Sequence, residues 1–269
     1  MRDDPVLILE GVHNFRDHGG WAVSGGGRLK RGLLWRSGEH ADATDADLER
    51  IAALGLANVF DLRSGTERTA RPCRRPEGFS ARVHLNDDDI RQQAPHVVAA
   101  KEAAKAIRPS TLHGDPESAR AGMRMAYTSF PFRPKLVAMI RQYLEVLAHG
   151  EGPSLINCMA GKDRTGIAVA VLHQAAGVHP DDAVADYVLT NTAGNLEARI
   201  AAGKKSIEAT AGHVDEAALR VVMGVEPEYL EAAFSGMRER NGSIDGYLRE
   251  VVGADDALRA RLRAHLVEV

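Results

Sequence analysis

The sequence predicts a single α/β domain in which helices flank a mainly parallel central sheet of four to five strands. Three observations favour this fold class. Short β-prone segments alternate with a helical segment in the first third of the chain. Strand, helix, strand order needs crossover connections, which join parallel strands. The length of 269 residues, with 44% apolar and 26% charged residues, is ordinary for a globular protein.

Local residue patterns predict the first strands and the first helix. The β-prone runs cover residues 6–9, 33–36, 58–62 and 81–85. Between the second and third runs, Leu48, Ile51 and Leu54 recur every three residues, which is the spacing of one helix face. Thr44 precedes Asp47 by three residues, as is typical of a helix start. We therefore expect a strand, helix, strand unit.

The segment of residues 90–129 interrupts this order. It contains a weak helical stretch at 97–107, followed by Pro109 and Gly114. Long excursions within a compact domain are usually lids, binding insertions or mobile loops. We predict one domain, residues 1–269, with a helical, lid-like insertion at 90–129. A small helix packed on the core is the alternative.

The strand and helix patterns resume after this insertion. Residues 134–147 have one apolar helical face, and an apolar strand follows at 154–158. Further helices are predicted at residues 164–176, 180–190, 195–209, 227–240, 243–251 and 255–266.

Composition argues against several classes of protein. The 34 Lys and Arg residues nearly balance the 37 Asp and Glu residues, so we expect no nucleic-acid partner. The two cysteines cannot form a disulfide framework, which favours a reducing compartment. The 11 histidines show no metal-binding spacing, so we expect no metal.

The same reading favours a cytoplasmic protein. Residues 1–15 lack the charge and apolar pattern of a signal peptide. The most apolar helical stretch, residues 166–178, is too short to span a bilayer, so we expect no transmembrane segment. Export without a signal peptide stays open.

Residues 157–166, with the sequence NCMAGKDRTG, connect the strand at 154–158 to the next helix. Unpaired N–H groups and the helix dipole make such a loop an anion site. Five residues separate Cys158 from Arg164, so a loop curled around an anion would place the sulfur below it and the guanidinium beside it. Gly161 permits the close backbone approach that this needs. The spacing therefore predicts a phosphate-binding loop.

Cys158 is the expected nucleophile. A free thiol has a pKa of about 8.5, which helix N-termini and nearby cations lower. We therefore expect an ionised sulfur in the pocket that binds phosphate, as covalent phosphoryl transfer requires. Thr165 would donate a hydrogen bond to this sulfur when the phosphocysteine is hydrolysed. A buried structural cysteine is the alternative.

With these residues, the chain resembles the cysteine-dependent protein-tyrosine phosphatases, specifically the bacterial atypical branch of the protein-tyrosine-phosphatase B type with its AGKDRTG loop. Further segments resemble landmarks of that family, in the right order: NFRDHGG (14–20), LLWRSGE (33–39), LGLANVFDLRSGTE (54–67), DYVLTN (186–191) and EYLEAAFSGMRERNGSIDGYL (228–248). Asn157 departs from the family, which usually has His there. The resemblance implies the cysteine-phosphatase fold and hydrolysis of phosphotyrosine, with phosphoserine, phosphothreonine and phosphoinositides as further substrates.

The leaving oxygen of such a substrate needs a proton from a general acid. The resemblance places this acid after the strand at 81–85, where Asp87, Asp88 and Asp89 stand. We favour Asp87, and a solvated acidic turn is the alternative. The resemblance also implies a functional role for Asp163, for which pairing with Lys162 or another basic side chain is the alternative.

Lys162 and Arg63 are further candidates for contact with substrate. Lys162 would either accept polyanionic head groups or be a solvated lysine. Arg63 follows a strand end that faces the expected crevice, and a salt bridge with Glu67 or Asp61 is the alternative.

Two other features are expected to be structural or incidental. Arg16 and Asp17 would form an ion pair that fixes the turn before Gly19. Cys73, between prolines in a basic loop, is expected to be an incidental surface cysteine.

The expected reaction is phosphate monoester hydrolysis through Cys158, with a phosphorylated protein or a phosphoinositide as substrate, inorganic phosphate as product and no cofactor. A phosphate-recognition protein without turnover and a rhodanese-type sulfurtransferase are the alternatives. The candidate catalytic residues are Cys158, Arg164, Asp87, Asp163 and Thr165. The candidate substrate-binding residues are Met159, Ala160, Gly161, Lys162, Asp163, Arg164 and Arg63.

Overall fold

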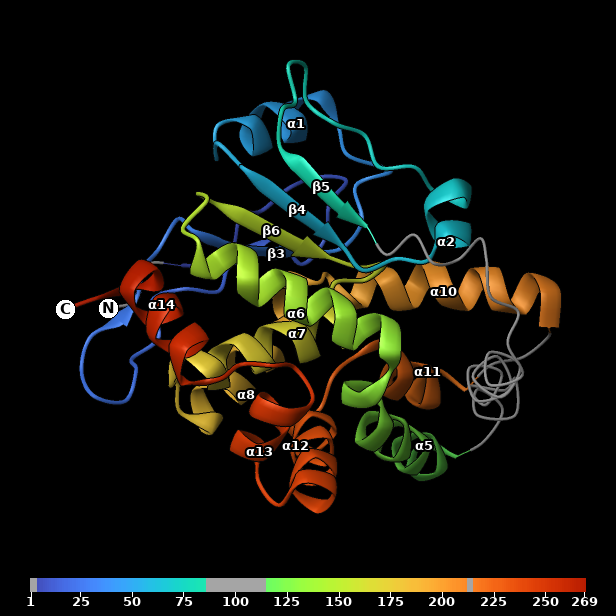
Figure 1. Ribbon diagram of the computed structural model, residues 1–269. Helices are drawn as coiled ribbons and strands as arrows, with labels where there is room; N and C mark the ends of the chain where they lie inside the picture. The colour runs from blue at the N-terminus through green and yellow to red at the C-terminus, as the bar shows by residue number, and fades with distance from the viewer. Residues whose placement is uncertain (1–3, 86–114, 212–214) are drawn as a thin grey trace.

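The computed structural model describes residues 4–85, 115–211 and 215–269. Its main sheet has five strands in the order β1-β3-β6-β4-β5 (Figure 1). The strands are β1 (Arg16–Asp17), β3 (Leu34–Ser37), β4 (Asn58–Asp61), β5 (Arg82–Leu85) and β6 (Ser154–Asn157). All neighbours pair in parallel except β1, which runs antiparallel to β3. The prediction of a mainly parallel sheet of four to five strands is confirmed.

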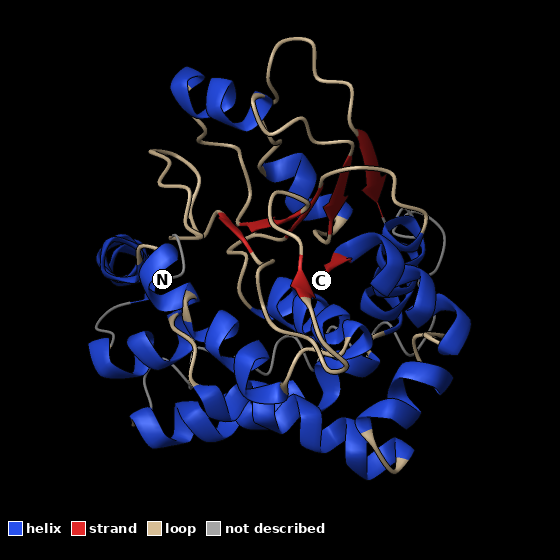
Figure 2. Ribbon diagram, turned by 90° about the vertical axis from the view of Figure 1, so that its left-hand side faces the viewer, coloured by secondary structure: helices blue, strands red, loops and turns tan. Residues whose placement is uncertain are grey.

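Helices cover both faces of this sheet. They are α1 (Asp45–Ala52), α2 (Gly65–Ala70), α5 (Pro116–Ser129), α6 (Pro134–Ala148), α7 (Asp163–Ala176), α8 (Pro180–Val188), α9 (Thr190–Ala193), α10 (Leu196–Ala211), α11 (Glu216–Met223), α12 (Pro227–Asn241), α13 (Ile244–Glu250) and α14 (Asp256–Leu266), with a 3-10 turn η2 (Phe130–Phe132). Figure 2 shows most of them gathered on one side of the strands.

Two apolar cores result from this layering. On one face, α1 packs Leu48 and Ile51 against Val59 and Leu155 of the sheet. On the other face, α7 is buried almost throughout and joins the larger core with α5, α6, α12 and α14. Because α7 is apolar on all sides, it fits a helix surrounded by other helices and the sheet. Because α7 is buried, its N-terminus has a fixed position relative to the carboxyl end of β6.

The part of the expected insertion that the structure describes is a helix of this larger core. Residues 116–129 form α5, which lies along α12 (Figure 1). Met123 and Tyr127 of α5 are buried. The helix expected at 97–107 and the acidic residues 87–89 lie outside the described residues.

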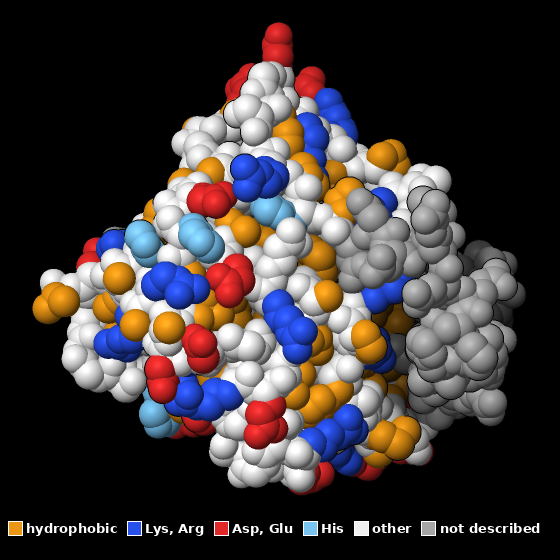
Figure 3. Space-filling view, in the orientation of Figure 1, with side chains coloured by type: hydrophobic (Ala, Val, Ile, Leu, Met, Phe, Trp, Pro, Cys, Tyr) orange, Lys and Arg blue, Asp and Glu red, His pale blue; other side chains and the backbone are white. Residues whose placement is uncertain are grey.

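A second sheet has two strands and joins distant parts of the described chain. β2 (Arg28–Leu29) pairs with β7 (Val267–Glu268), so the last residues bind to the first third of the chain. On the face in Figure 3, acidic and basic side chains are interspersed, as the near balance of charges predicts.

Candidate active site

The loop of residues 158–162 lies at the carboxyl end of β6, the middle strand of the sheet. Asn157, the last residue of β6, is in register with Ser37 of β3 and Asp61 of β4. In open α/β sheets, the carboxyl ends of parallel strands face the ligand crevice. Cys158 follows Asn157 and is buried. Because α7 begins at Asp163, the positive end of its dipole lies at the loop.

The backbone of this loop has the geometry of an anion cradle. Gly161 has a φ of +65°, and an added Cβ would lie 2.4 Å from the Ser37 carbonyl, so only glycine fits. The N–H groups of Ala160, Gly161 and Lys162 have no acceptor within the described ranges. Since buried N–H groups normally have a partner, these three are available to an anion beside Cys158.

Arg164 is held by a bidentate salt bridge. Its Nη1 and Nη2 each lie 2.7 Å from a carboxylate oxygen of Glu67, which is in the first turn of α2. Nη1 also donates to the Leu62 carbonyl at 3.2 Å. Partial burial opposes ionisation of Glu67, but the Arg164 hydrogen bonds outweigh it and lower the pKa of this carboxyl to about 2. The donors of Arg164 outside these bonds are Nε–H and one N–H of Nη2, which form one edge of the guanidinium.

Lys162 is buried and directed away from solvent, so it is not a solvated lysine. Its Nζ donates to the carbonyls of Val222 and Gly224, at the C-terminal end of α11. Burial lowers its pKa. Lys162 therefore ties the loop to α11.

Asp163 is anchored by two tyrosines. The Tyr127 hydroxyl donates to Asp163 Oδ1 at 2.6 Å, and the Tyr187 hydroxyl donates to Tyr127 at 2.6 Å. The expected pairing with Lys162 is also present, at 3.6 Å. Burial raises the pKa of both tyrosines, so both hydroxyls stay protonated.

Two polar atoms near the nucleophile are buried without a partner among the described residues. They are Thr165 Oγ1 and Asn157 Oδ1. The Asn157 amide donates to Asp61 Oδ1 at 3.4 Å. Thr165 is next to Arg164 in the first turn of α7, so its hydroxyl is available to a group bound in the loop.

Comparison with known proteins identifies the family. The model of the tyrosine phosphatase family matches residues 7–268. The chain belongs to the tyrosine phosphatase family. It is 34% identical to the triple specificity protein phosphatase PtpB of Mycobacterium tuberculosis, over 97% of this chain and 99% of the relative. It is also 32% identical to a protein of Cupriavidus necator whose name assigns it provisionally to the tyrosine-protein phosphatases, over 96% of this chain and 87% of the relative.

Arg199 is a residue of this tyrosine phosphatase that sequence analysis missed. It lies on α10, and its Nη1 is buried with no hydrogen-bond partner in the described structure. Burial lowers its pKa, while its electrostatic interactions with Asp163 and Cys158 act in the opposite direction. Arg199 thus adds positive charge near the sulfur. No motif could have indicated it, because only the folding of α10 toward the loop brings it there.

The guanidinium of Arg63 in this phosphatase is held by hydrogen bonds to neighbouring groups of the protein. Two of its nitrogens bind the Asp61 carboxylate at 2.8 and 2.9 Å, and Nη2 lies 3.0 Å from Cys73 Sγ. The alternative of a salt bridge with Asp61 is therefore present, whereas Glu67 binds Arg164 instead. Cys73 also accepts from the His40 N–H, so it is not an incidental surface residue.

The expected ion pair between Arg16 and Asp17 is wrong. The guanidinium of Arg16 binds Asp186 on α8, with Nε at 3.4 Å. Asp17 instead accepts from the N–H groups of Gly19 and Gly32, both at 2.7 Å. The sequence could not show this, because Asp186 is 170 residues away from Arg16.

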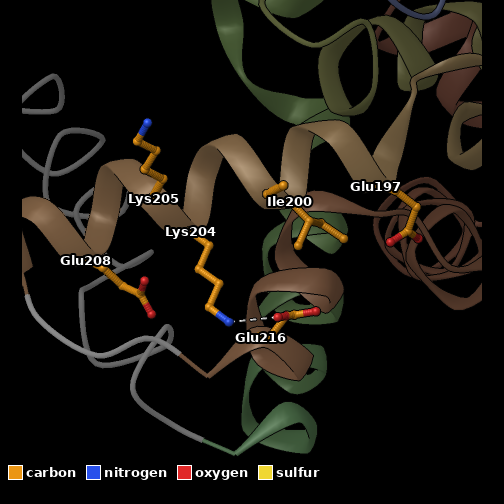
Figure 4. A pocket seen from close by; sticks show the side chains of 7 residues that line it. Glu197, Ile200, Lys204, Lys205, Glu208 and Glu216 are labelled. Carbon is orange, nitrogen blue, oxygen red and sulfur yellow. Dashed lines mark hydrogen bonds and ion pairs between the residues drawn. The ribbon is translucent and has the colours of Figure 1, made fainter.

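A cavity of about 150 Å³ adjoins Arg164. Its lining combines apolar and basic side chains, namely Leu62, Arg63, Ser64, Arg133, Lys135, Leu136 and Met139 together with Arg164. Arg133 lies over the Phe130 ring, 3.8 Å from its centre. A separate hollow between α10 and α11 contains none of the loop residues and is lined largely by charged groups, including the ion pair of Lys204 and Glu216 (Figure 4).

Within the described part of the chain, no helix has the length and apolar character that a membrane crossing requires.

Proposed function

We propose that this enzyme hydrolyses phosphate monoesters through a phosphocysteine on Cys158. The observation that carries the proposal is the set of N–H groups at Ala160, Gly161 and Lys162, which have no acceptor among the described residues and lie between the buried sulfur and the helix N-terminus. Such groups stabilise the equatorial oxygens of a phosphoryl group in the transition state. Arg164 would bind two of these oxygens with the edge that Glu67 leaves free.

The reaction has two steps. In the first, the Cys158 thiolate attacks phosphorus in line, the bond to the ester oxygen breaks, and an acid protonates the leaving oxygen. In the second, the carboxylate left by this acid takes a proton from water, the water oxygen attacks phosphorus, the sulfur–phosphorus bond breaks, and inorganic phosphate leaves. The Thr165 hydroxyl would donate to the departing sulfur. Asp87, outside the described residues, is our proposed acid.

Phosphotyrosine is the proposed principal substrate. The cavity beside Arg164 has an apolar side formed by Leu62, Leu136 and Met139, which suits an aromatic ring. The name of the M. tuberculosis relative gives that protein a triple specificity, and we extend the proposal to phosphoserine, phosphothreonine and phosphoinositides. A cytoplasmic location, favoured by two free cysteines, remains part of the proposal.

The test is phosphate release from p-nitrophenyl phosphate, phosphotyrosine and phosphoserine peptides and a phosphoinositide, from pH 5 to 8 with EDTA. We expect turnover in the wild type, none in Cys158→Ser, and phosphate-ester binding in both. Asp87→Asn should lower kcat most for substrates with poor leaving groups, with Asp88→Asn as its matched control. Binding without turnover in the wild type would indicate a recognition protein. Turnover of thiosulfate instead of phosphate esters would indicate a sulfurtransferase.

A further inference from the structure

Three successive carbonyl groups of the loop are held on its outer side. The Met159 carbonyl accepts from the Glu39 N–H at 3.0 Å. The Ala160 carbonyl accepts from the Asn14 side-chain amide at 3.3 Å. The Gly161 carbonyl accepts from the same amide at 2.7 Å and from Arg36 Nη2 at 2.9 Å. All these donors come from the first 39 residues of the chain.

The direction of these carbonyls fixes the direction of the N–H groups. In a planar trans peptide, C=O and N–H point to opposite sides. Bonds that hold the Ala160 and Gly161 carbonyls outward therefore turn the N–H groups of Gly161 and Lys162 inward, toward the anion. We propose that Asn14 and Arg36 are positioning residues that preorganise these two N–H groups for the transition state. The inference rests on the proposed phosphate-binding role of the loop.

Asn14 has the properties that this role needs. It is fully buried and has a φ of +62°, a conformation that few residues other than glycine and asparagine adopt readily. Its Nδ2 donates to the loop while its Oδ1 accepts from Arg16 Nη1. Aspartate would offer no donor and alanine would strain the backbone. Strained residues of this kind concentrate at functional sites.

Arg36 belongs to a buried ionic cluster beneath the loop. Its Nη1 binds Asp186 Oδ2 at 2.6 Å, and Arg16 binds the same carboxylate. His18 and His173 lie beside this cluster, and burial lowers the pKa of both, so they are neutral. Two guanidinium groups thus face one carboxylate. The remaining positive charge favours an anion in the loop, in addition to the hydrogen bond that Arg36 donates.

The test compares variants that keep the backbone but change the donors. Asn14→Gly retains the positive φ without strain and removes the amide, and Asn14→Asp retains the shape and removes the donor. Thr190→Val is the matched control, because the Thr190 hydroxyl accepts from Arg16 in the same cluster at 3.3 Å and, in the described part of the chain, makes no hydrogen bond to the loop. The measurements are kcat and KM for p-nitrophenyl phosphate, Ki for orthovanadate, and Tm.

We expect both Asn14 variants to lower kcat about 10-fold and to raise the vanadate Ki by a similar factor, since Arg36 still holds the Gly161 carbonyl. Thr190→Val should lower Tm but change kcat and Ki less than about 2-fold. Arg36→Lys keeps the charge but loses the guanidinium, which binds Asp186 and the Gly161 carbonyl at the same time. The double variant Asn14→Gly/Arg36→Lys should therefore lose more than the product of the single losses.

Soluble, folded Asn14 variants with wild-type kcat and vanadate Ki would overturn the inference. If neither Asn14 variant folds, Arg36→Lys alone tests the inference, which then requires a lower kcat and a higher vanadate Ki in this variant. Loss of activity with an unchanged vanadate Ki would also contradict it. Activity of the wild type that does not depend on Cys158 would refute the proposed function instead, so the two failures are distinguishable.

Discussion

At the scale of single residues, Glu67 decides how Arg164 is presented. Its carboxylate occupies both Nη groups of Arg164 while its own N–H and side chain form the capping box of α2 with Ser64. A carboxylate so close to the phosphate site repels the substrate unless the guanidinium lies between them. The salt bridge therefore both orients and partly neutralises Arg164.

Glu67→Gln tests this arrangement, because glutamine keeps the capping box and removes the charge. We expect kcat/KM for p-nitrophenyl phosphate to fall about 10-fold, as the charge-assisted bidentate pairing is lost. Ser64→Ala is the control. It removes the cap of α2 but not the pair with Arg164, so its loss in kcat/KM should be smaller than that of Glu67→Gln, although Ser64 also lines the cavity beside Arg164. Equal losses in both variants would show that α2, and not the charge, is what matters.

Arg199 is the second residue whose role depends on charge near the sulfur. Removing its guanidinium, whose Nη1 is buried, should weaken binding of a phosphate dianion, so we expect Arg199→Met to raise KM about 10-fold with a smaller change in kcat. Arg199→Lys should recover part of the affinity. Arg220 lies on the neighbouring α11, where it is exposed and pairs with Glu197 of α10, so Arg220→Met should leave KM unchanged. An unchanged KM in Arg199→Met would remove this residue from the site.

At the scale of elements, α5 supports the loop from the larger core. Tyr127 of α5 bonds both Asp163 at the start of α7 and Tyr187 of α8. Three helices therefore meet at one hydroxyl. α5 lies in the segment 90–129, which the sequence predicted as an insertion. The described part of this segment therefore belongs to the framework of the site.

Tyr127→Phe should destabilise the protein by about 1–3 kcal/mol, because it removes the hydroxyl that bonds both the buried Tyr187 hydroxyl and the part-buried Asp163 carboxylate. Tyr187→Phe removes one bond and keeps the one between Tyr127 and Asp163, so its loss should be smaller. Urea unfolding of both variants at pH 7 measures the difference. If Tyr187→Phe costs as much as Tyr127→Phe, the bond to Asp163 contributes little.

At the scale of the whole molecule, buried ionisable groups predict a protein that loses stability in acid. Burial lowers the pKa of His18, His173 and His40, the last to about 3. The unfolded chain binds protons at these sites below its usual pKa of about 6.5, whereas the folded protein does not. Stability is therefore fully present above pH 6.5 and declines as the pH falls below it.

Glu67 adds a second loss at lower pH. Its folded pKa of about 2 lies below the unfolded value, so the stability it contributes is present above pH 4.5 and lost as pH falls toward 2. We expect Tm to fall from pH 7 to pH 5.5 and more steeply below pH 4.5. Thermal unfolding across this range measures both, and His40→Asn should flatten the first part. A constant Tm from pH 7 to pH 5 would contradict the burial of neutral histidines.

Local patterns predicted those elements whose signals are local. The strands at 33–36, 58–62 and 81–85 match β3, β4 and β5 within one residue at each end, and the helix start at Thr44 is the observed cap of α1. The run at 6–9 is no strand and contributes only a bridge between Val6 and Arg16. The predicted helices did not include α2, α5, α9 and α11. β1 has only two residues, too few to give a periodic signal.

The sequence by itself determined the fold class, the family and the loop with Cys158 and Arg164, because glycine, helix start and spacing act within ten residues. Only the tertiary structure decided which partners these residues have. Both Nη groups of Arg164 bind Glu67. Lys162 donates to the carbonyls of Val222 and Gly224. Asn14 and Arg36 donate to carbonyls of the loop. These contacts join residues 60 to 147 positions apart. Polar groups removed from water need a partner, and the fold provides it from a distant part of the chain.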